Sequence, residues 1–591
     1  MKKILIATVL AALTASATET NIPTIVVTAA AQTPENAAIH KALRAEPGVV
    51  LNSQGGSQND LSVRGSSFSG AGLALGGLTL RNPQTEHFNT ELPIPAAMLS
   101  RPQVLTGLDN QGGHLVGTVN FDLLPMTGTK AGEIGFGSDH RDWQSVLLQQ
   151  MLTDTLGIGV FAGRESANGV DYDDNDYDRE YAGGHLQYHT DDAQIDFLAA
   201  HQEKEFGTRG YYGANPAWGP PSEETEDTLI YLAARKGDLN ADYLRGGVSW
   251  HQFRDYYAVP DGTYWNRHRS RISSAFFDGR TLEVNGWALG WRADVEEERV
   301  ASDGFSAFAP PPWGLGHHHR TRGGLSLLPQ WRGDRLKITA GARGEFFTDE
   351  SSEFLPQVGL EYLLSDNLTA FASYTETVRL PSYTELNYNS PASLGNAGLK
   401  PQSTQQTEIG LKGIPSETAD WKLAAFHRRS HDTVDWIKAT PAARWTAQNL
   451  GDVDVFGAEA AAGWYPAQNL DVQFAYTWIY KDKDADDFGA YASRYALDYP
   501  EHLAQASVLW RPVAPVEIGT VQTLRWQPDN RVRENSDFGV LGRFVLRITP
   551  PCADFLTCSL LVDNLWDDDF QEFPGQRPAD RKISVAFSTE F

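Results

Sequence analysis

The last eleven residues of the chain, Arg581 to Phe591, alternate between apolar and polar side chains with a period of two. Ile583, Val585 and Phe587 fall on one face of the expected strand, and small or polar residues fall on the other. The same alternation recurs over roughly 460 residues, which is typical of a membrane β-barrel, where one face of each strand meets lipid and the other meets the lumen. Because an open sheet edge in hydrocarbon leaves backbone groups unsatisfied, we expect this last strand to pair with the first.

Short polar turns alternate with long polar loops after about residue 130, and they allow the strands to be counted. The ten short turns lie near 153–154, 191–192, 236–238, 278–280, 332–334, 365–367, 416–418, 466–468, 511–512 and 550–551. Together with one strand near Glu133 to Gly137 and the final strand, they predict 22 strands, with both chain ends on the short-turn side. Barrels of this size are expected to hold a plug. The predicted fold class is an all-β membrane protein, a 22-stranded antiparallel transmembrane β-barrel with an N-terminal α+β plug domain in its lumen.

The first residues have the pattern of a secretory signal peptide. Lys2 and Lys3 precede an apolar run, and Ala15-Ser16-Ala17 forms a small-x-small cleavage site. The apolar run is about ten residues long, too short for the roughly 20 residues of a transmembrane helix. We therefore predict a signal peptide over residues 1–17 and an exported mature chain.

Two further segments precede the barrel. Residues 18–33 are polar and Ala-rich around Thr24, Ile25, Val26, Val27 and Thr28, an extended segment suited either to strand addition to a partner or to a first plug strand. Residues 34–127 contain glycine-punctuated apolar runs, which predict a small plug domain with about five strands and short helices near 34–43 and 95–99. The barrel is expected over residues 128–591.

Composition excludes several function classes. The formal net charge is -26, with 75 acidic against 49 basic residues, so nucleic acid is not an expected partner. The chain has no Gly-Lys-Ser phosphate loop, no Gly-x-Ser-x-Gly elbow and no His-Glu-x-x-His motif, so we predict no catalytic residues and no enzyme activity.

Several stretches resemble the TonB-dependent outer-membrane receptors of Gram-negative bacteria, most closely the cobalamin and siderophore receptors. The similar stretches are Ile25 to Ala29 (the TonB box), Asp60 to Gly65 in the plug, Val104 to Phe121 at its end, Phe371 to Leu386 with Gly395 to Pro401 in mid-barrel, Glu408 with Gly410, Val455 to Glu459, and Val562 to Trp566 with Pro574 to Arg577 and terminal Phe591. Two positions depart from the family pattern. Thr106-Gly107-Leu108 stands where Arg-Gly-Pro is usual, and Gln402 stands where Glu is common. Both departures bear on salt bridges between the plug and the barrel.

The resemblance implies active uptake of a scarce metal chelate, cobalamin-like or iron–siderophore, across the outer membrane. It also implies the partners: TonB with its inner-membrane motor complex, outer-membrane lipid, and the small-molecule chelate. TonB would pair with residues 24–28 by strand addition and rearrange the plug. Two alternatives stay open, a passive porin or adhesin with a vestigial plug, and an exported β-rich hydrolase.

Candidate ligand-binding residues lie in loops that we expect to face outward. The plug loops 66–72 and 82–89 are polar and glycine-rich, and the barrel loop 207–221 has aromatic side chains that suit either a flat chelate or an interfacial girdle. The candidates are Ser66, Ser67, Phe68, Gln84, His87, Phe88, Tyr211, Tyr212 and Trp218.

Metal and sulfur chemistry give three weaker signals. The acidic loop 171–178 could bind calcium, the only cofactor considered, through Asp171, Asp173, Asp176 and Asp178, or it could be a solvated acidic loop. The run 317–319 holds three consecutive histidines, which point in different directions on a strand and favour a loop-to-strand junction over a metal contact. Cys552 and Cys558 are close in sequence in an exported chain, which predicts a local disulfide.

Overall fold

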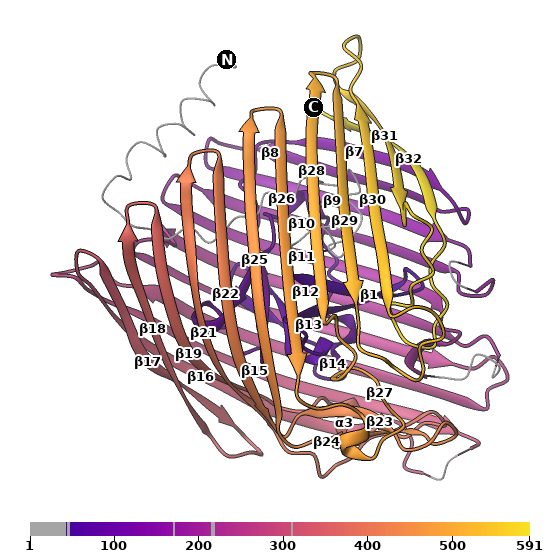
Figure 1. The fold of residues 1–591 in the computed structure, drawn as a ribbon. Helices are drawn as coiled ribbons and strands as arrows, with labels where there is room; N and C mark the ends of the chain where they lie inside the picture. The colour runs from indigo at the N-terminus through magenta and orange to yellow at the C-terminus, as the bar shows by residue number, and fades with distance from the viewer. Residues whose placement is uncertain (1–42, 44–47, 170–171, 214–218, 309–310) are drawn as a thin grey trace.

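The computed structural model describes residue 43 and residues 48–169, 172–213, 219–308 and 311–591, and within these ranges the dominant element is a closed antiparallel barrel of 22 strands (Figure 1). The predicted number of strands is therefore confirmed. The barrel strands are β7 (Lys130–Gly137), β8 (Asp142–Met151), β9 (Leu156–Ala167), β10 (Tyr177–His189), β11 (Ala193–Gly207), β12 (Ser222–Gly237), β13 (Tyr243–Ala258), β14 (Tyr264–Arg280), β15 (Trp287–Ser306), β16 (Gly316–Arg332), β17 (Leu336–Phe347), β18 (Glu353–Ser365), β19 (Leu368–Arg379), β21 (Gln402–Ser416), β22 (Ala419–His431), β25 (Val453–Ala467), β26 (Leu470–Lys481), β28 (His502–Val513), β29 (Val516–Trp526), β30 (Phe538–Ile548), β31 (Leu556–Asp563) and β32 (Lys582–Glu590).

The last strand closes the ring as the sequence predicts. β32 pairs with β31 on one side and with β7 on the other, in a register that places Ala586 opposite Gly135. Ile583, Val585 and Phe587 are exposed on the outer face, whereas Ala586 is fully buried on the inner face. Every strand in the ring therefore pairs with a neighbour on each side, as a strand in lipid requires.

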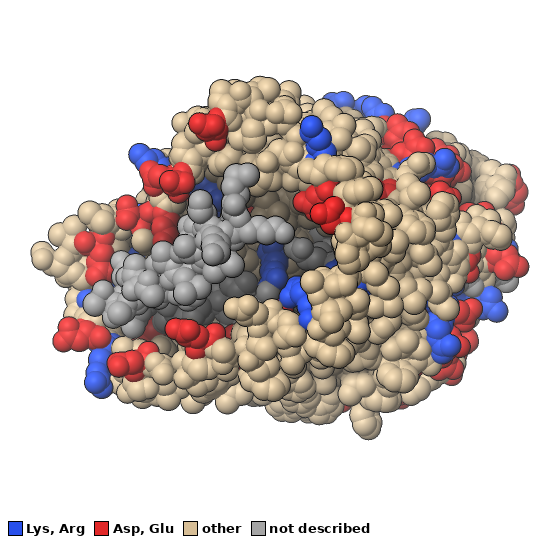
Figure 2. Space-filling view, turned by 90° about the horizontal axis from the view of Figure 1, so that it is seen from above, with Lys and Arg blue, Asp and Glu red and all other residues tan. Residues whose placement is uncertain are grey.

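The same alternation holds in the middle of the chain. On β11, Ile195 and Phe197 are exposed outward, whereas Gln194 and Asp196 are buried inside. Among the described residues no helix has the length and apolarity needed to cross a bilayer. The lumen face is polar, and Figure 2, which views the barrel from the end of the tight turns, shows Lys and Arg side chains within a hollow of that face.

The plug lies inside the barrel (Figure 1) and consists of two small sheets joined by single turns of 3-10 helix. A hairpin of β1 and β2 stands beside a sheet of order β4-β3-β6-β5. The predicted helix at 95–99 is only one 3-10 turn, and of the predicted helix at 34–43 only Leu43 lies within the described residues. The plug elements are β1 (Val49–Gln54), β2 (Gln58–Val63), η1 (Phe68–Gly70), β3 (Ala71–Leu75), β4 (Leu78–Leu80), η2 (Glu86–Phe88), η3 (Ala96–Met98), β5 (Gln103–Thr106), η4 (Gly107–Asp109) and β6 (Gly117–Phe121).

Long loops cover the barrel end opposite the tight turns, and three of them share a sheet. This loop sheet has the order β20-β24-β23-β27, and its strands come from the loops after β19, β22 and β26. The loop elements are η5 (Tyr211–Gly213), α3 (Tyr383–Asn387), β20 (Ser393–Leu394), β23 (Val434–Lys438), β24 (Trp445–Asn449), η7 (Asp486–Phe488) and β27 (Ala492–Ser493).

A buried ion triad holds the plug to the wall. Arg64, which follows β2, has a left-handed φ of 49° and is succeeded by Gly65 with φ 66°, so the chain turns sharply and the guanidinium points at the wall. It lies 2.7 Å from the Glu408 carboxylate and 2.6 Å from that of Glu459. Burial alone would lower the pKa of Arg64, but the two carboxylates raise it above its ordinary value, so the cation is retained.

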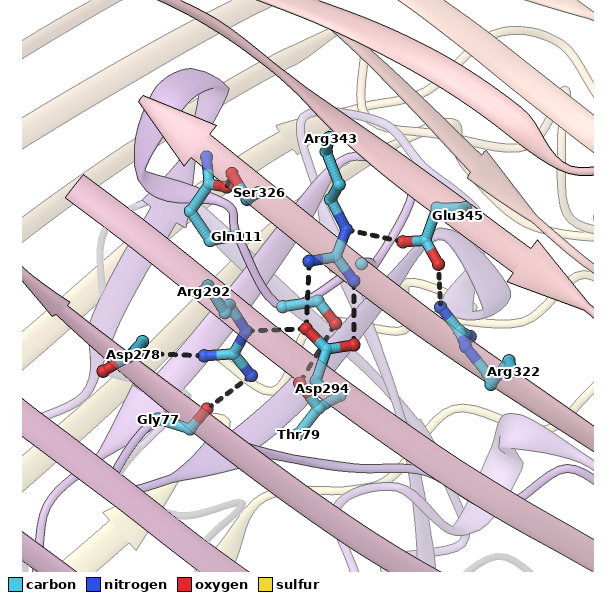
Figure 3. A network of polar contacts seen from close by, with 12 residues as sticks. Gly77, Thr79, Gln111, Asp278, Arg292, Asp294, Arg322, Ser326, Arg343 and Glu345 are labelled. Carbon is cyan, nitrogen blue, oxygen red and sulfur yellow. Dashed lines mark hydrogen bonds and ion pairs between the residues drawn. The ribbon is translucent and has the colours of Figure 1, made fainter. Parts of the chain in front are cut away.

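A second polar contact with the plug comes from strands β14 to β17 (Figure 3). Arg292 donates to the carbonyl of Gly77 in the plug at 3.1 Å, and it also pairs with Asp278 at 2.9 Å and Asp294 at 3.0 Å. Arg343 holds the other side of Asp294 at 2.8 Å. Because each of these charges has a partner, the network binds the plug without leaving an unpaired charge in the lumen wall.

The disulfide predicted between Cys552 and Cys558 is wrong, because both residues are free thiols in the structure. Cys558 pairs with Ile548 in the β30–β31 ladder, whereas Cys552 lies in the turn beyond the ladder.

We expect Arg64→Met to loosen the plug, because it removes the plug cation that both Glu408 and Glu459 bind. Glu408 then keeps Lys422 of the wall, at 3.4 Å, as its ion-pair partner among the described residues. Breaking a buried pair costs about 3–5 kcal/mol, and the loss should appear as faster amide hydrogen exchange over residues 48–123 in the detergent-purified receptor. Arg254→Met, which breaks an exposed pair with Glu226, is the control and should cost less than about 1 kcal/mol. Equal protection in the two variants would contradict the anchoring role of the triad.

The free cysteines give a direct chemical expectation. Alkylation of the denatured but unreduced receptor should add two labels per chain, one at each free thiol, as read by intact mass. A Cys558→Ser chain should take up one label. Absence of labelling in the unreduced parent chain would restore the disulfide.

Candidate functional site

A cavity of about 80 Å³ lies at the long-loop end of the barrel, between the plug turns and the covering loops. We call it the outer cavity. Its lining comes from three sources that are far apart in sequence: the plug, the ends of strands β12 to β14, and the loops around α3 and the loop sheet. The lining residues used below are Phe68, Gln84, His87, Phe88, Tyr212, Glu223, Asp255, Tyr257, Asn266, His268, Glu385, Tyr388, Trp436, Arg494 and Tyr495.

The plug side of the outer cavity is built around His87 in η2. Its Nδ1 lies 2.8 Å from a carboxylate oxygen of Asp60 on β2, which fixes the ring. Phe68 of η1 stacks on the imidazole at 4.0 Å between ring centroids, and Tyr495 from the loop after β26 stands edge-on to Phe68 at 4.8 Å. Plug and loop aromatics therefore meet directly across the cavity.

The barrel side carries a Tyr–carboxylate contact. Tyr212 in η5 has its hydroxyl 2.7 Å from a carboxylate oxygen of Glu223 at the start of β12 and 2.6 Å from Gln58 in the plug. Burial, with a further contribution from Glu223, raises the pKa of Tyr212 well above its usual range. The phenol is therefore neutral at physiological pH and serves as a hydrogen-bond donor.

Asp435 on β23 positions two aromatic residues of the wall. One carboxylate oxygen accepts from the backbone N–H of Trp436 at 2.7 Å and of Tyr495 at 3.1 Å, and the other accepts from Ser493 on β27. Burial raises the pKa of this carboxyl to about 6. One buried side chain thus joins the loop after β22 to the loop after β26.

Helix α3 links the covering loops to the plug. Ser382 and Glu385 form a capping box at its start, and Arg379 holds Glu385 through two contacts of 3.0 Å. The next backbone N–H groups donate to plug carbonyls, Tyr383 to Pro83 and Thr384 to Gln84, each at 2.9 Å. The plug loop 82–85 is therefore bonded to the lid above it.

The structure brings together five of the predicted ligand-binding residues and separates others. Phe68, Gln84, His87, Phe88 and Tyr212 line the outer cavity. Ser66 and Ser67 do not, and Tyr211 is packed against Phe206 with 1% of its surface exposed. Trp218 and Thr24 to Thr28 lie outside the described residues, so those predictions stay untested.

The sequence reading missed the barrel half of the cavity. Asp255 and Tyr257 end β13, and Asn266 and His268 begin β14, so alternate residues on either side of loop 259–263 face the lumen. That alternation in the sequence could have identified these four residues as facing the lumen. Trp436, Arg494 and Tyr495 gave no signal, because their positions depend on the loop sheet.

The acidic loop forms contacts within the protein. Asp176 accepts from the backbone N–H of Gly169 at 2.8 Å, and Asp178 pairs with Arg164. Asp171 lies outside the described residues, and among those described no three His, Cys, Asp or Glu side chains are grouped to hold a metal ion. Calcium binding by Asp171, Asp173, Asp176 and Asp178 stays a prediction.

The middle histidine of the run 317–319 has a structural role. His318 stacks on Tyr383 of α3 at 5.1 Å, and its Nε2 lies 2.6 Å from the carbonyl of Leu315. This placement agrees with the expected loop-to-strand junction, since the run begins β16.

A larger cavity of about 280 Å³ lies between the β1–β2 hairpin and the wall formed by β7 to β11 and β28 to β32. Several charges in its lining have partners, such as Lys204 with Glu91 at 2.9 Å and Arg141 with Glu165 at 2.8 Å. The space is therefore a gap alongside the plug in which these buried charges are paired.

Comparison with known proteins gives a consistent result. Residues 126–565 match the family model described as TonB dependent receptor-like, beta-barrel. The vitamin B12 transporter BtuB of Vibrio vulnificus is 21% identical over 460 residues, covering 71% of this chain and 69% of that protein.

Two solved structures share the fold along nearly their whole length. The siderophore receptor PirA of Pseudomonas aeruginosa superposes with a TM-score of 0.70 at 14% identity, covering 95% of this chain and 97% of PirA. The copper transporter OprC gives 0.74 at 14% identity, covering 93% and 94%. With the closed 22-stranded barrel and its internal plug, the family match shows that this chain belongs to the TonB-dependent receptors, β-barrel proteins of the outer membrane.

Proposed function

We propose that this receptor takes up a scarce metal chelate, cobalamin-like or an iron–siderophore, across the outer membrane with energy supplied through TonB. The observation that carries the proposal is the outer cavity, because plug and covering loops both contribute to it. A ligand held there contacts the element that must move for passage to occur.

The names of similar proteins support the substrate class. The relatives are called a vitamin B12 transporter, a siderophore receptor and a copper transporter. Their common theme is a metal or a metal complex in low supply, and the aromatic lining of the outer cavity suits the organic part of such a complex.

The plug anchoring favours gated transport over a passive porin. Arg64 is held by two carboxylates inside the barrel, and Arg292 binds the plug backbone. Opening the lumen requires work against these contacts, and a passive pore has no energy source for that work. Force applied to the segment before the plug supplies that work, by strand addition of TonB to residues 24–28.

We expect Val26→Pro to abolish uptake while leaving ligand binding unchanged, because proline removes a backbone donor from the strand that TonB would extend. The assay is growth of a strain lacking its own receptor on cobalamin or on a panel of iron chelates. Val26→Thr keeps the backbone donor and should retain uptake. Full uptake by the proline variant would favour passive diffusion.

Aromatic residues of the outer cavity should contribute to affinity. Tyr257→Ala removes a lining side chain beside Tyr212 and Tyr264, and we expect about a tenfold weaker binding of the chelate that supports growth, close to 1.4 kcal/mol. Tyr256→Ala, one residue earlier and exposed on the outer face of β13, is the matched control and should bind as the parent does. Equal affinities would place the ligand elsewhere.

A further inference from the structure

Two buried amide oxygens in the outer cavity have no donor, and a carboxylate lies beside them. The amide oxygens are Oε1 of Gln84 and Oδ1 of Asn266, which have no hydrogen-bond partner within the described part of the chain. The carboxylate is that of Asp255, which is hydrogen-bonded to the Glu223 carboxyl. Gln84, Asn266 and Asp255 all line the cavity, and each is at most 4% exposed. Leaving a buried acceptor unpaired costs about 1–3 kcal/mol, so the site is complete only when something donates to these atoms.

The nitrogens of the same two amides are already engaged. Nε2 of Gln84 donates to Oδ2 of Asp255 at 2.7 Å. Nδ2 of Asn266 lies 3.0 Å from the Tyr264 hydroxyl and 3.1 Å from that of Tyr388. These contacts also fix which end of each amide carries the oxygen, since the nitrogens face acceptors. The two amide oxygens can therefore accept hydrogen bonds from the N–H groups of a ligand.

The charge around these acceptors is negative. Asp255 and Glu223 both line the cavity and are hydrogen-bonded to each other, so the two carboxyl groups share one proton and carry one negative charge. Neither is ion-paired with a Lys or Arg among the residues that the structure describes. A third carboxylate, Glu385, is neutralised by Arg379. The one lining cation of the described chain is Arg494, whose guanidinium lies over the rings of Trp445 and Tyr495 at 5.3 and 5.2 Å.

The remaining lining is aromatic. Phe68, Tyr212, Tyr257, Tyr388, Trp436 and Tyr495 line the same cavity. Aromatic ring faces attract cations, most strongly when water is excluded. The negative charge of the Asp255–Glu223 pair, two open amide oxygens and an aromatic wall together match a nitrogen cation that carries N–H donors.

The size limits what can enter. A volume of about 80 Å³ holds roughly five to eight small atoms, at about 10–15 Å³ of such space for each water-sized probe. That is an end group rather than a whole metal complex. A bare metal ion fits less well, because no three metal-binding side chains are grouped among the described residues.

We propose that the outer cavity binds a protonated amine or guanidinium end group of the ligand. The inference rests on the proposed function in that the group belongs to the transported chelate, and it narrows the substrate class to complexes with a cationic arm. The Asp255–Glu223 pair supplies the countercharge, and Gln84, Asp255 and Asn266 accept the N–H groups. A chelate with anionic groups at this position would meet that negative charge and be repelled.

The experiment uses the full-length receptor in detergent and three aromatic probes of similar size whose end group is cationic, neutral or anionic: benzylammonium, benzyl alcohol and benzoate. Dissociation constants come from ligand-observed NMR titration. We expect benzylammonium to bind at least tenfold more tightly than either other probe. Asp255→Asn should weaken that preference, and Asp255→Asn combined with Glu223→Gln, which removes the shared charge altogether, should abolish it.

Glu224→Gln is the matched control, since Glu224 follows Glu223 on β12 but is exposed on the outer face, and it should keep the preference. Heat-modifiable gel mobility confirms that each variant is folded. Equal binding of the three probes, no binding of any, or a preference that survives both cavity variants would overturn the inference.

Failure of this inference and failure of the proposed function are distinguishable. The probe titration needs no TonB and no transport, so a cation preference without energy-dependent uptake would overturn only the proposed function. Conversely, uptake that the Val26→Pro change abolishes, in a receptor with no preference among the three probes, would overturn only the cation site.

Discussion

Backbone hydrogen bonding in a medium without water is the constraint on which this structure depends. Each barrel strand has a partner on both sides only because β32 returns to β7. Once the ring closes, alternation assigns the outer face to lipid and the inner face to polar side chains. The inner face then carries the charges that hold the plug, including Glu408, Glu459 and Arg292. Closure, polarity of the lumen and retention of the plug are therefore parts of one arrangement.

Much of the barrel could be predicted because its signals are local. A strand of period two and a short polar turn are readable within about ten residues, and Ile583, Val585 and Phe587 lie on the face that the alternation assigns. The plug was less readable, because its sheet order β4-β3-β6-β5 joins β3 to β6 in parallel across many residues. The disulfide was misjudged because proximity in sequence is not proximity along a ladder, and Cys558 lies within β31 while Cys552 lies in the turn.

The candidate site divides in the same way. Phe68 and His87 could be predicted, since glycine-rich loops between plug strands must emerge at an end of the barrel. Asp255 and Asn266 were within reach of the alternation rule but required the register of β13 and β14. Trp436 and Tyr495 were beyond it, because Asp435 joins them only after two separate loops have met in the loop sheet. Contacts between segments far apart in sequence, and not residue type, therefore set the limit on which site residues could be predicted.

The seating of Phe68 and His87 against Tyr495 has one further consequence. The plug itself forms one wall of the outer cavity. Movement of the plug would remove that wall, so a ligand bound there would lose these contacts as the path through the barrel opens. Under the proposed uptake, release of the ligand would therefore follow from the movement of the plug and would need no separate step.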